Sequence, residues 1–218
     1  MPRIIDVLLS LLALLVLLPL FIPIVVILLL TGEHKVFYLQ TRVGYKNKDF
    51  KIIKFATMLS NSANMGSGSL TLKNDPRVLP FGTFLRKTKI NELPQILNII
   101  IGDLSIVGPR PQMQVDFEKY SDEVQKKIYN VRPGLTGIGS IVFRDEESLI
   151  SLAAENENPH DFYKRVISPY KGELEMWYQK HRSFYLDFQL IFITAWAIVA
   201  PENRLYEKWF KDLPKREF

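Results

Sequence analysis

KTKINELPQILNIIIGDLSIVGPRP, residues Lys87–Pro111, is the stretch that decides how this chain is interpreted. Asn91 stands directly before Glu92, Pro94 follows, and the next residues are mostly apolar. Asn is a preferred N-cap residue, an acidic side chain is favourable in the first helical turn, and proline is tolerated there. The pattern therefore predicts a helix that begins at Asn91 and ends at Ile101. A second interpretation stays open, in which the amide and the carboxylate belong to an active site.

The end of this stretch, Gly108–Pro111, is a stiff turn that fixes the direction of Arg110, and a second such turn, Arg132–Gly134, holds another arginine. Other basic residues also lie beside turns or element ends: Lys54, Arg77, Arg86 and Lys87. Arginine offers a planar fork that matches phosphate oxygens. A carboxylate among such cations, here Glu92, can bind Mg²⁺ or act on a phosphoryl group. Each basic residue alone is typical of a solvated surface, but together they indicate a phosphate site.

The longest apolar run extends from Val7 to Leu30, with Ser10 as its polar side chain. A cleaved signal peptide does not fit, because the run is longer than a signal core and no small-residue cleavage site follows it. A membrane-spanning helix fits the length, since about 20 apolar residues cross a bilayer.

Pro19 and Pro23 lie in the middle of this run. Each removes a backbone donor and clashes with the preceding turn, which predicts a kink or a break. Basic residues stand on both sides of the run, whereas a simple span is asymmetric: Arg3, Lys35, Arg42, Lys46 and Lys48. A re-entrant hairpin over residues 1–32, which dips into one leaflet and returns, therefore fits better than a kinked span.

Residues 33–218 have the composition of a folded domain, and the expected fold class is α+β and mainly helical. Short strands are expected over 36–45 and 49–55, with a long loop over 59–80. Helices are predicted over 81–87, 115–129, 146–155, 161–166 and 169–180. The apolar and aromatic stretch at about 183–200 carries Asp187, Gln189 and Thr194, so it is expected to lie on the membrane surface or pack on the domain.

The composition narrows the classes of partner and of chemistry. A net charge of +5 favours anionic partners such as phosphates or an acidic lipid surface. The basic residues are scattered and no nucleic-acid motif is present, so nucleic acid is not an expected partner. The chain has no Cys, which excludes disulfides, thiol catalysis and Cys-ligated zinc, and its three His residues lack the spacing of a metal site.

The run FLRKTKINELPQILNIIIGDLSIVGPRP resembles the core signature of the bacterial sugar transferases. These are the monotopic phosphoglycosyl transferases that start glycan assembly on polyprenyl phosphate. Five further pieces agree in the same order: RIID at 3–6, FKIIKFATM at 50–58, NDPR at 74–77, FGTFLRKT at 81–88 and VRPGLTG at 131–137. The resemblance covers nearly the whole chain and is strongest from Phe50 to Gly137.

The resemblance implies a re-entrant membrane helix broken at a proline, amphipathic helices on the membrane, and a small catalytic domain at the cytosolic face of the bacterial inner membrane. It implies transfer of a sugar 1-phosphate from a UDP-sugar to polyprenyl (undecaprenyl) phosphate, with release of UMP and a requirement for Mg²⁺. This is the first membrane step of bacterial glycan assembly, so downstream glycosyltransferases are possible partners. It also implies catalytic roles for residues 91 and 92, Mg²⁺ binding by Glu92, and substrate binding by five basic residues: Lys54, Arg77, Arg86, Arg110 and Arg132.

The chain departs from the family pattern at its most important position. The family uses an Asp-Glu pair in which the Asp forms a phosphosugar–enzyme ester, and here Asn91 stands in place of that Asp. Three explanations are open: a substitution that stalls the reaction, a natural Asn in an enzyme that uses direct attack by the lipid phosphate, or a catalytically silent relative that binds lipid phosphate or a partner transferase. Two further departures are Ala56, where the family motif has Arg, and Leu18 before Pro19, where the family often has Ser.

Overall fold

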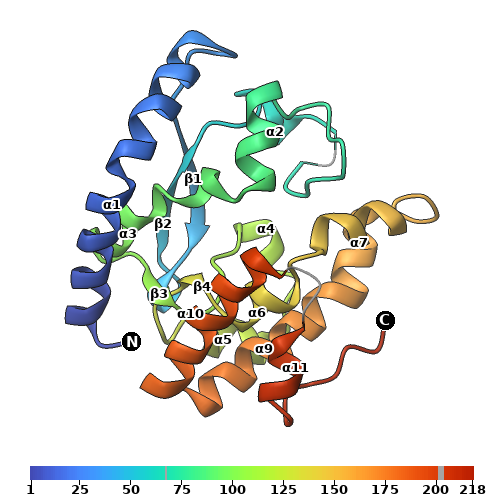
Figure 1. Ribbon diagram of the computed structural model, residues 1–218. Coiled ribbons are helices and arrows are strands. Elements are labelled where there is room, and N and C mark those ends of the chain that lie inside the picture. Colours follow the sequence, from blue (N-terminus) through green and yellow to red (C-terminus); the bar gives the residue numbers. More distant parts are fainter. Residues whose placement is uncertain (67, 201–203) are drawn as a thin grey trace.

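The computed structural model describes residues 1–66, 68–200 and 204–218, and Figure 1 shows a long N-terminal helix along one side of a mixed α/β body that is mostly helical, as expected. The strands are β1 (Phe37–Val43), β2 (Asp49–Phe55), β3 (Ser105–Val107) and β4 (Gly134–Thr136). The helices are α1 (Arg3–Leu30), α2 (Pro80–Lys87), α3 (Gln95–Ile101), α4 (Gln114–Phe117), α5 (Asp122–Lys127), α6 (Ile138–Val142), α7 (Glu146–Ala153), α8 (Pro159–Phe162), α9 (Ser168–His181), α10 (Phe184–Val199) and α11 (Leu205–Trp209). Tight turns η1 (Tyr45–Asn47), η2 (Ser62–Asn64) and η3 (Ile90–Glu92) and a π turn, η4 (Tyr163–Ile167), complete the order.

Helix α1 runs without interruption through Pro19 and Pro23. The predicted pair of half-helices separated by a break is therefore wrong for this structure. Each proline removes one backbone donor, but the turns before and after it stay helical. The division of the chain at residue 32 into a membrane segment and a domain stays a prediction. In the structure α1 packs against α3 and β3 of the domain.

Both ends of α1 are attached to the rest of the molecule, which helps to keep it one continuous helix. Near its start, the buried Asp6 accepts hydrogen bonds from the Ser105 hydroxyl at 2.8 Å and from the backbone N–H of Ile106 at 3.1 Å. Near its end, Ile24 and Leu28 are buried against side chains of β2 and α2. These contacts at two separated points oppose the kink that the prolines favour.

Strands β1 and β2 form the antiparallel hairpin that the sequence predicts, rich in aromatic and β-branched residues. Tyr38 pairs with Lys54, and the alternation of side chains places Arg42 on the same face as Lys54. Strand β2 also contacts α3 and the turn η3. The hairpin therefore carries two basic residues toward the segment that contains residues 91 and 92.

Strands β3 and β4 form a second pair, which is parallel, and no sequence pattern predicted it. Its backbones approach very closely at three glycines. A Cβ atom on Gly134 would lie 2.1 Å from the backbone nitrogen of Gly108, and one on Gly137 would lie 2.1 Å from the carbonyl oxygen of Gly108. We call these three residues the glycine seam. Because Gly108 begins the turn that carries Arg110, the seam fixes where that turn starts.

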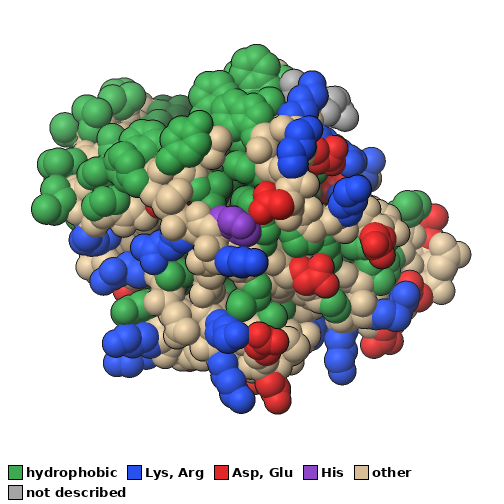
Figure 2. Space-filling model, turned by 90° about the horizontal axis from the view of Figure 1, so that it is seen from below, with side chains coloured by type: hydrophobic (Ala, Val, Ile, Leu, Met, Phe, Trp, Pro, Cys, Tyr) green, Lys and Arg blue, Asp and Glu red, His purple; other side chains and the backbone are tan. Residues whose placement is uncertain are grey.

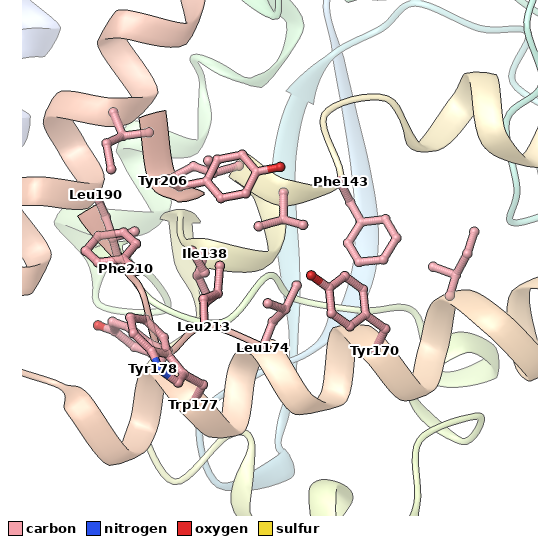
Figure 3. Close-up of a cluster of buried hydrophobic side chains, with 14 of the residues drawn as sticks. Ile138, Phe143, Tyr170, Leu174, Trp177, Tyr178, Leu190, Tyr206, Phe210 and Leu213 are labelled. Carbon is pink, nitrogen blue, oxygen red and sulfur yellow. The ribbon is translucent and has the colours of Figure 1, made fainter. Parts of the chain in front are cut away.

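The largest hydrophobic core lies among α6, α9, α10 and the C-terminal segment (Figure 3). In this view α9 crosses below the cluster, with Leu174, Trp177 and Tyr178 pointing from it toward Ile138 and Leu190. The core also includes the following labelled side chains: Phe143, Tyr170, Tyr206, Phe210 and Leu213. This packing makes α9 the central support of the domain, beneath the site described below.

Large apolar side chains remain exposed on α1 and α10. Among the described residues, α1 is the one helix that is long and apolar enough to cross a membrane, and about 11% of its most apolar window is buried. Helix α10 exposes Phe184, Tyr185, Phe188, Phe192 and Trp196. Figure 2 shows the hydrophobic side chains gathered on one side of a face whose other side carries charged groups. Contiguous apolar surface of this extent marks a membrane or partner contact and supports membrane association.

Candidate active site

Three charged side chains from separate parts of the chain meet at one point. Glu92, in the turn η3, accepts a hydrogen bond from Arg110 Nη2 at 2.8 Å. Lys54, from β2, lies with its Nζ 3.5 Å from the same Glu92 oxygen, Oε1. Arg110 comes from the turn after β3. We call these three residues, with Arg86, the cation cluster, because one carboxylate is shared among several positive groups.

The pKa values in the cluster are set by burial and by the excess of positive over negative side chains. Burial alone would raise the pKa of Glu92, but the charges of Arg110 and Lys54 and the hydrogen bond from Arg110 hold that pKa well below its usual range. Burial lowers the pKa of Lys54 to about 7, although the charge of Glu92 opposes this effect. The Glu92 carboxylate raises the pKa of Arg110. At neutral pH the cluster therefore keeps a net positive charge, which suits a phosphate ligand.

Asn91 does not cap a helix. Residues 90–92 form the short turn η3, α3 begins at Gln95, and Lys89 before the turn has a left-handed backbone with φ of 60°. Asn91 is buried at 5% exposure, and its side-chain oxygen Oδ1 has no hydrogen-bond partner among the described residues. The capping interpretation is therefore wrong. A buried amide oxygen without a partner is rare and requires another explanation, so the interpretation as part of a site remains.

Arg86 belongs to the cluster through its charge. Its Nη2 atom lies 2.6 Å from Glu147 Oε1, and its charge helps to lower the pKa of Lys54. Glu147 is 49% exposed, so this ion pair is open to solvent and can exchange for a ligand. The structure thus brings together four of the seven predicted catalytic and substrate-binding residues as a charged group: Lys54, Arg86, Glu92 and Arg110, with Asn91 beside them in the chain.

Arg77 is bound to groups of the loop at 59–80, and its predicted role in substrate binding stays a prediction. It is 3% exposed and forms an ion pair of 2.6 Å with Asp75. Its guanidinium also donates to four carbonyl oxygens of the loop at 59–80: those of Ser62, Met65, Gly68 and Leu70. Asp75 in turn accepts from the backbone N–H of Arg77 at 3.0 Å. The pair therefore organises this long loop from its interior.

Arg132 lies at the C-terminal end of α3, with partners other than the cation cluster. Its Nε atom donates to the carbonyl oxygen of Gly102 at 2.9 Å, and its guanidinium lies 5.2 Å from the centre of the Tyr45 ring. A cation at a helix C-terminus stabilises the helix dipole. These contacts hold the Arg132 side chain, and its predicted role in substrate binding stays a prediction.

Sequence reasoning missed the residues that hold Arg110 in place. The Tyr129 hydroxyl donates to the carbonyl oxygen of Arg110 at 2.9 Å and accepts from the backbone N–H of Gln112 at 2.9 Å. Glu175, from α9, accepts from the backbone N–H of Arg110 at 3.4 Å. Burial raises the pKa of Glu175 to about 8. These contacts join residues 19 and 65 positions apart, and no local pattern could have signalled them.

Arg42, a basic residue that follows the apolar run in the sequence, also contacts the turn that carries Arg110. Its Nη2 atom donates to Gln40 Oε1 at 2.6 Å and its Nη1 atom donates to the carbonyl oxygen of Pro111 at 3.2 Å. Burial, and then the charge of Arg110, lower its pKa. The alternation along β1, which puts Arg42 on the face of Lys54, is the signal that could have found it.

The residues of the site fit a magnesium ion that takes most of its ligands from a substrate. Within residues 1–66, 68–200 and 204–218, no group of three or more His, Cys, Asp or Glu could hold a metal ion. Glu92 Oε1 is engaged by Arg110 and Lys54, which leaves the other carboxylate oxygen for a metal. Mg²⁺ is commonly held by one or two carboxylates together with waters and substrate phosphates, so a single carboxylate suffices.

A family model described as bacterial sugar transferase matches residues 1–201. The chain is 38% identical over 163 residues to the exopolysaccharide production protein ExoY of Sinorhizobium fredii, an alignment that covers 68% of this chain and 72% of that protein. The range matched by the family model includes the hairpin, the turn η3 and the turn that carries Arg110.

Two other relatives have names that state a reaction. The chain is 32% identical over 197 residues to the UDP-N-acetylgalactosamine-undecaprenyl-phosphate N-acetylgalactosaminephosphotransferase of Aeromonas hydrophila, over 89% of this chain and 43% of that protein. It is 31% identical over 180 residues to the undecaprenyl-phosphate galactose phosphotransferase of Salmonella typhimurium, over 76% of this chain and 34% of that protein. The chain therefore spans less than half the length of these two phosphotransferases.

Proposed function

The chain belongs to the bacterial sugar transferase family, and from that premise we propose that it transfers a sugar 1-phosphate from a UDP-sugar to polyprenyl phosphate and releases UMP. The names of its relatives, which include two undecaprenyl-phosphate sugar phosphotransferases and an exopolysaccharide production protein, support this reaction and a place in glycan assembly. The observation that carries the proposal is the cation cluster, in which Lys54 and Arg110 share the single carboxylate of Glu92.

The chemistry takes place at the β-phosphorus of the UDP-sugar. An oxygen of the lipid phosphate forms a bond to this phosphorus while the bond to the bridging oxygen breaks, and UMP leaves with the electron pair. The product is a sugar joined to the lipid through a diphosphate. This direct route needs no side-chain nucleophile, which suits Asn91, because an amide is a very poor nucleophile.

The residues of the cluster supply positioning and charge. Arg110 is held by Glu92 and by its turn, so its guanidinium can bind phosphate oxygens with little loss of conformational freedom. Lys54 and Arg86 add positive charge where the pyrophosphate and the lipid phosphate meet. Phosphoryl transfer depends mostly on such positioning and charge neutralisation. When Mg²⁺ is bound at Glu92, it would neutralise further charge on the phosphates of the donor.

The arrangement of α1 supports a monotopic protein, and we place its domain at the cytosolic face of the bilayer because the family resemblance implies that face. A helix that crosses a bilayer places its two ends on opposite sides, whereas the start and the end of α1 both pack on the same domain. The helix is 28 residues long, which corresponds to about 42 Å at 1.5 Å per residue, and most of its surface is apolar and exposed. We include in the proposal that α1 lies within one leaflet as a single helix, with both of its ends at the inner-membrane surface and α10 beside it.

Release of UMP from a panel of UDP-sugars, with Mg²⁺ and with or without undecaprenyl phosphate, tests this function. UMP that forms only with the lipid is the expected result of direct displacement, and Glu92→Gln should abolish it. UMP formed without lipid, in an amount equal to the enzyme, would contradict direct displacement and indicate a covalent intermediate.

Asn91 favours a second candidate, a catalytically silent relative that binds lipid phosphate or a partner transferase. The same assay separates the two, because a silent protein gives no UMP with any UDP-sugar. Recovery of UMP release in Asn91→Asp would then identify a transferase that lost its nucleophile. Continued silence would leave the binding protein as the better description.

A further inference from the structure

A pocket of about 270 Å³ lies where the C-terminal end of α1 meets β1, the end of β2 and α2. Its walls are largely apolar and include Leu28, Phe37, Ala56, Met58, Leu79 and Phe81. A small polar group also borders it, in which Lys35 Nζ donates to Ser60 Oγ at 2.6 Å and Ser60 donates to Glu33. Apolar walls with a few polar groups are typical of ligand sites.

The pocket adjoins the cation cluster along the hairpin and along α2. Tyr38, which lines the pocket, pairs with Lys54 across the two strands. Ala56 follows Lys54 on the same side of the chain, about 7 Å farther on at 3.4 Å per residue. Met58 Sδ lies 3.8 Å from Arg86 Nη1. A ligand that fills the pocket therefore has its polar end within reach of two cations.

On its other side the pocket borders the exposed apolar end of α1. Leu29 and Leu30 are 49% and 73% exposed, and Phe37, which lines the pocket itself, is 48% exposed. An apolar chain that leaves the pocket can continue along this surface, which is part of the region we place in the bilayer. The pocket thus connects a membrane surface with a phosphate-binding group, and this is the arrangement that a lipid phosphate requires.

Ala56 gives the pocket its apolar volume. It is 7% exposed and places only a methyl group at the wall. The motif that this segment resembles has Arg at this position, and an arginine here would occupy the space and bring a charge. Ala56 therefore keeps this part of the pocket open and uncharged.

We propose that this pocket binds the first isoprenoid units of a polyprenyl phosphate, with the phosphate group at Lys54 and Arg86. The inference rests on the proposed function, since it assigns a place to the lipid acceptor of that reaction. The pocket lies just below the usual range of small-molecule sites, about 300–1,000 Å³, so it suits a few isoprenoid units and not a whole lipid chain. The remaining chain follows the apolar surface of α1.

Binding of farnesyl phosphate to the full-length protein in detergent, measured without any UDP-sugar, tests the assignment. Ala56→Leu and Leu79→Trp narrow the pocket from two walls, and Ala63→Leu is a matched control on an exposed residue. We expect a rise of tenfold or more in the dissociation constant for farnesyl phosphate in both pocket variants and a change of less than twofold in the control. Inorganic phosphate, which has no chain, should bind all four proteins equally.

Several results would overturn the assignment. These are unchanged farnesyl phosphate binding in both pocket variants, or an equal loss of farnesyl phosphate and inorganic phosphate binding, which would mean that the cations had moved. If Ala56→Leu does not fold, Leu79→Trp decides alone. Equal competition by a diacyl phosphatidic acid would also contradict a site for isoprenoid chains.

The failure of this inference differs from the failure of the proposed function. A protein that releases no UMP but loses farnesyl phosphate binding in the pocket variants keeps the lipid site and loses the enzymatic proposal. A protein that releases UMP with an unchanged KM for undecaprenyl phosphate in both variants keeps the enzymatic proposal and loses the lipid site.

Discussion

Raising the pH from 7 to 8.5 should weaken phosphate binding at the cation cluster, because Lys54 loses its proton in that range. Burial lowers the pKa of Lys54 from its ordinary value of 10.5 to about 7. A phosphate ligand stabilises the ammonium form, so binding takes up a proton and becomes weaker as the pH rises. About half of the molecules carry the Lys54 proton at pH 7 and about one in thirty at pH 8.5, so the dissociation constant should rise about 16-fold between these two pH values.

Isothermal titration of the detergent-solubilised protein with UMP, between pH 7 and 9, measures this dependence. The phosphate of UMP is a dianion throughout, since the second pKa of a phosphate monoester is about 6. Titration in two buffers with different heats of ionisation gives the proton uptake directly. Lys54→Arg is the matched control, because its guanidinium keeps its charge over this range and its affinity should stay level. A level curve for the natural protein, or an equal slope in Lys54→Arg, would refute the reasoning.

Three further predictions concern single residues. Glu92→Gln should lower UMP release at least a hundredfold, measured by coupled assay, whereas Glu118→Gln on the exposed surface should leave it unchanged. Arg77→Ala should lower the free energy of unfolding by about 3–5 kcal/mol in urea denaturation, because Asp75 would remain buried without its partner. A loss below 1 kcal/mol would show that the loop does not depend on this pair. Arg132→Gln should change KM for the UDP-sugar less than twofold in initial-rate measurements, and a larger increase would return Arg132 to the site.

Much of the fold could be predicted from local patterns. The hairpin, α2 and α10 have aromatic or apolar residues at regular spacing, and the structure has them where the patterns placed them. Strands β3 and β4 were missed, since three residues are too few for an alternation to be visible. The break predicted at Pro19 and Pro23 is absent because the rule for proline is local, whereas α1 is also held by contacts with residues distant in the chain, from β2 and α2 to Ser105.

The candidate site was predictable where a turn controls the direction of a side chain. The stiff turn that carries Arg110 is visible in the sequence, whereas its ion pair with Glu92 is visible only in the structure. For Arg77 and Arg132 substrate binding stays a prediction, and in this structure both bind carbonyl oxygens, which an arginine near a turn can do as readily as it binds phosphate. Glu175 and Tyr129 act through the backbone of Arg110, and such contacts become visible only when the chain is folded.

The glycine seam implies an unusual pattern of tolerance to mutation. The position of Arg110 depends on residues 108, 134 and 137, whose contribution is that they have no side chain and so let the backbones approach closely. A displacement of about 1 Å near a reacting group can cost a hundredfold in rate, and a single methyl group here exceeds the available space. In a library of variants selected for activity, the charged residues around Glu92 could be replaced by other charged residues in several combinations. The three glycines would remain invariant, so the most informative signature of this site in a mutational scan would be three positions that carry no chemistry.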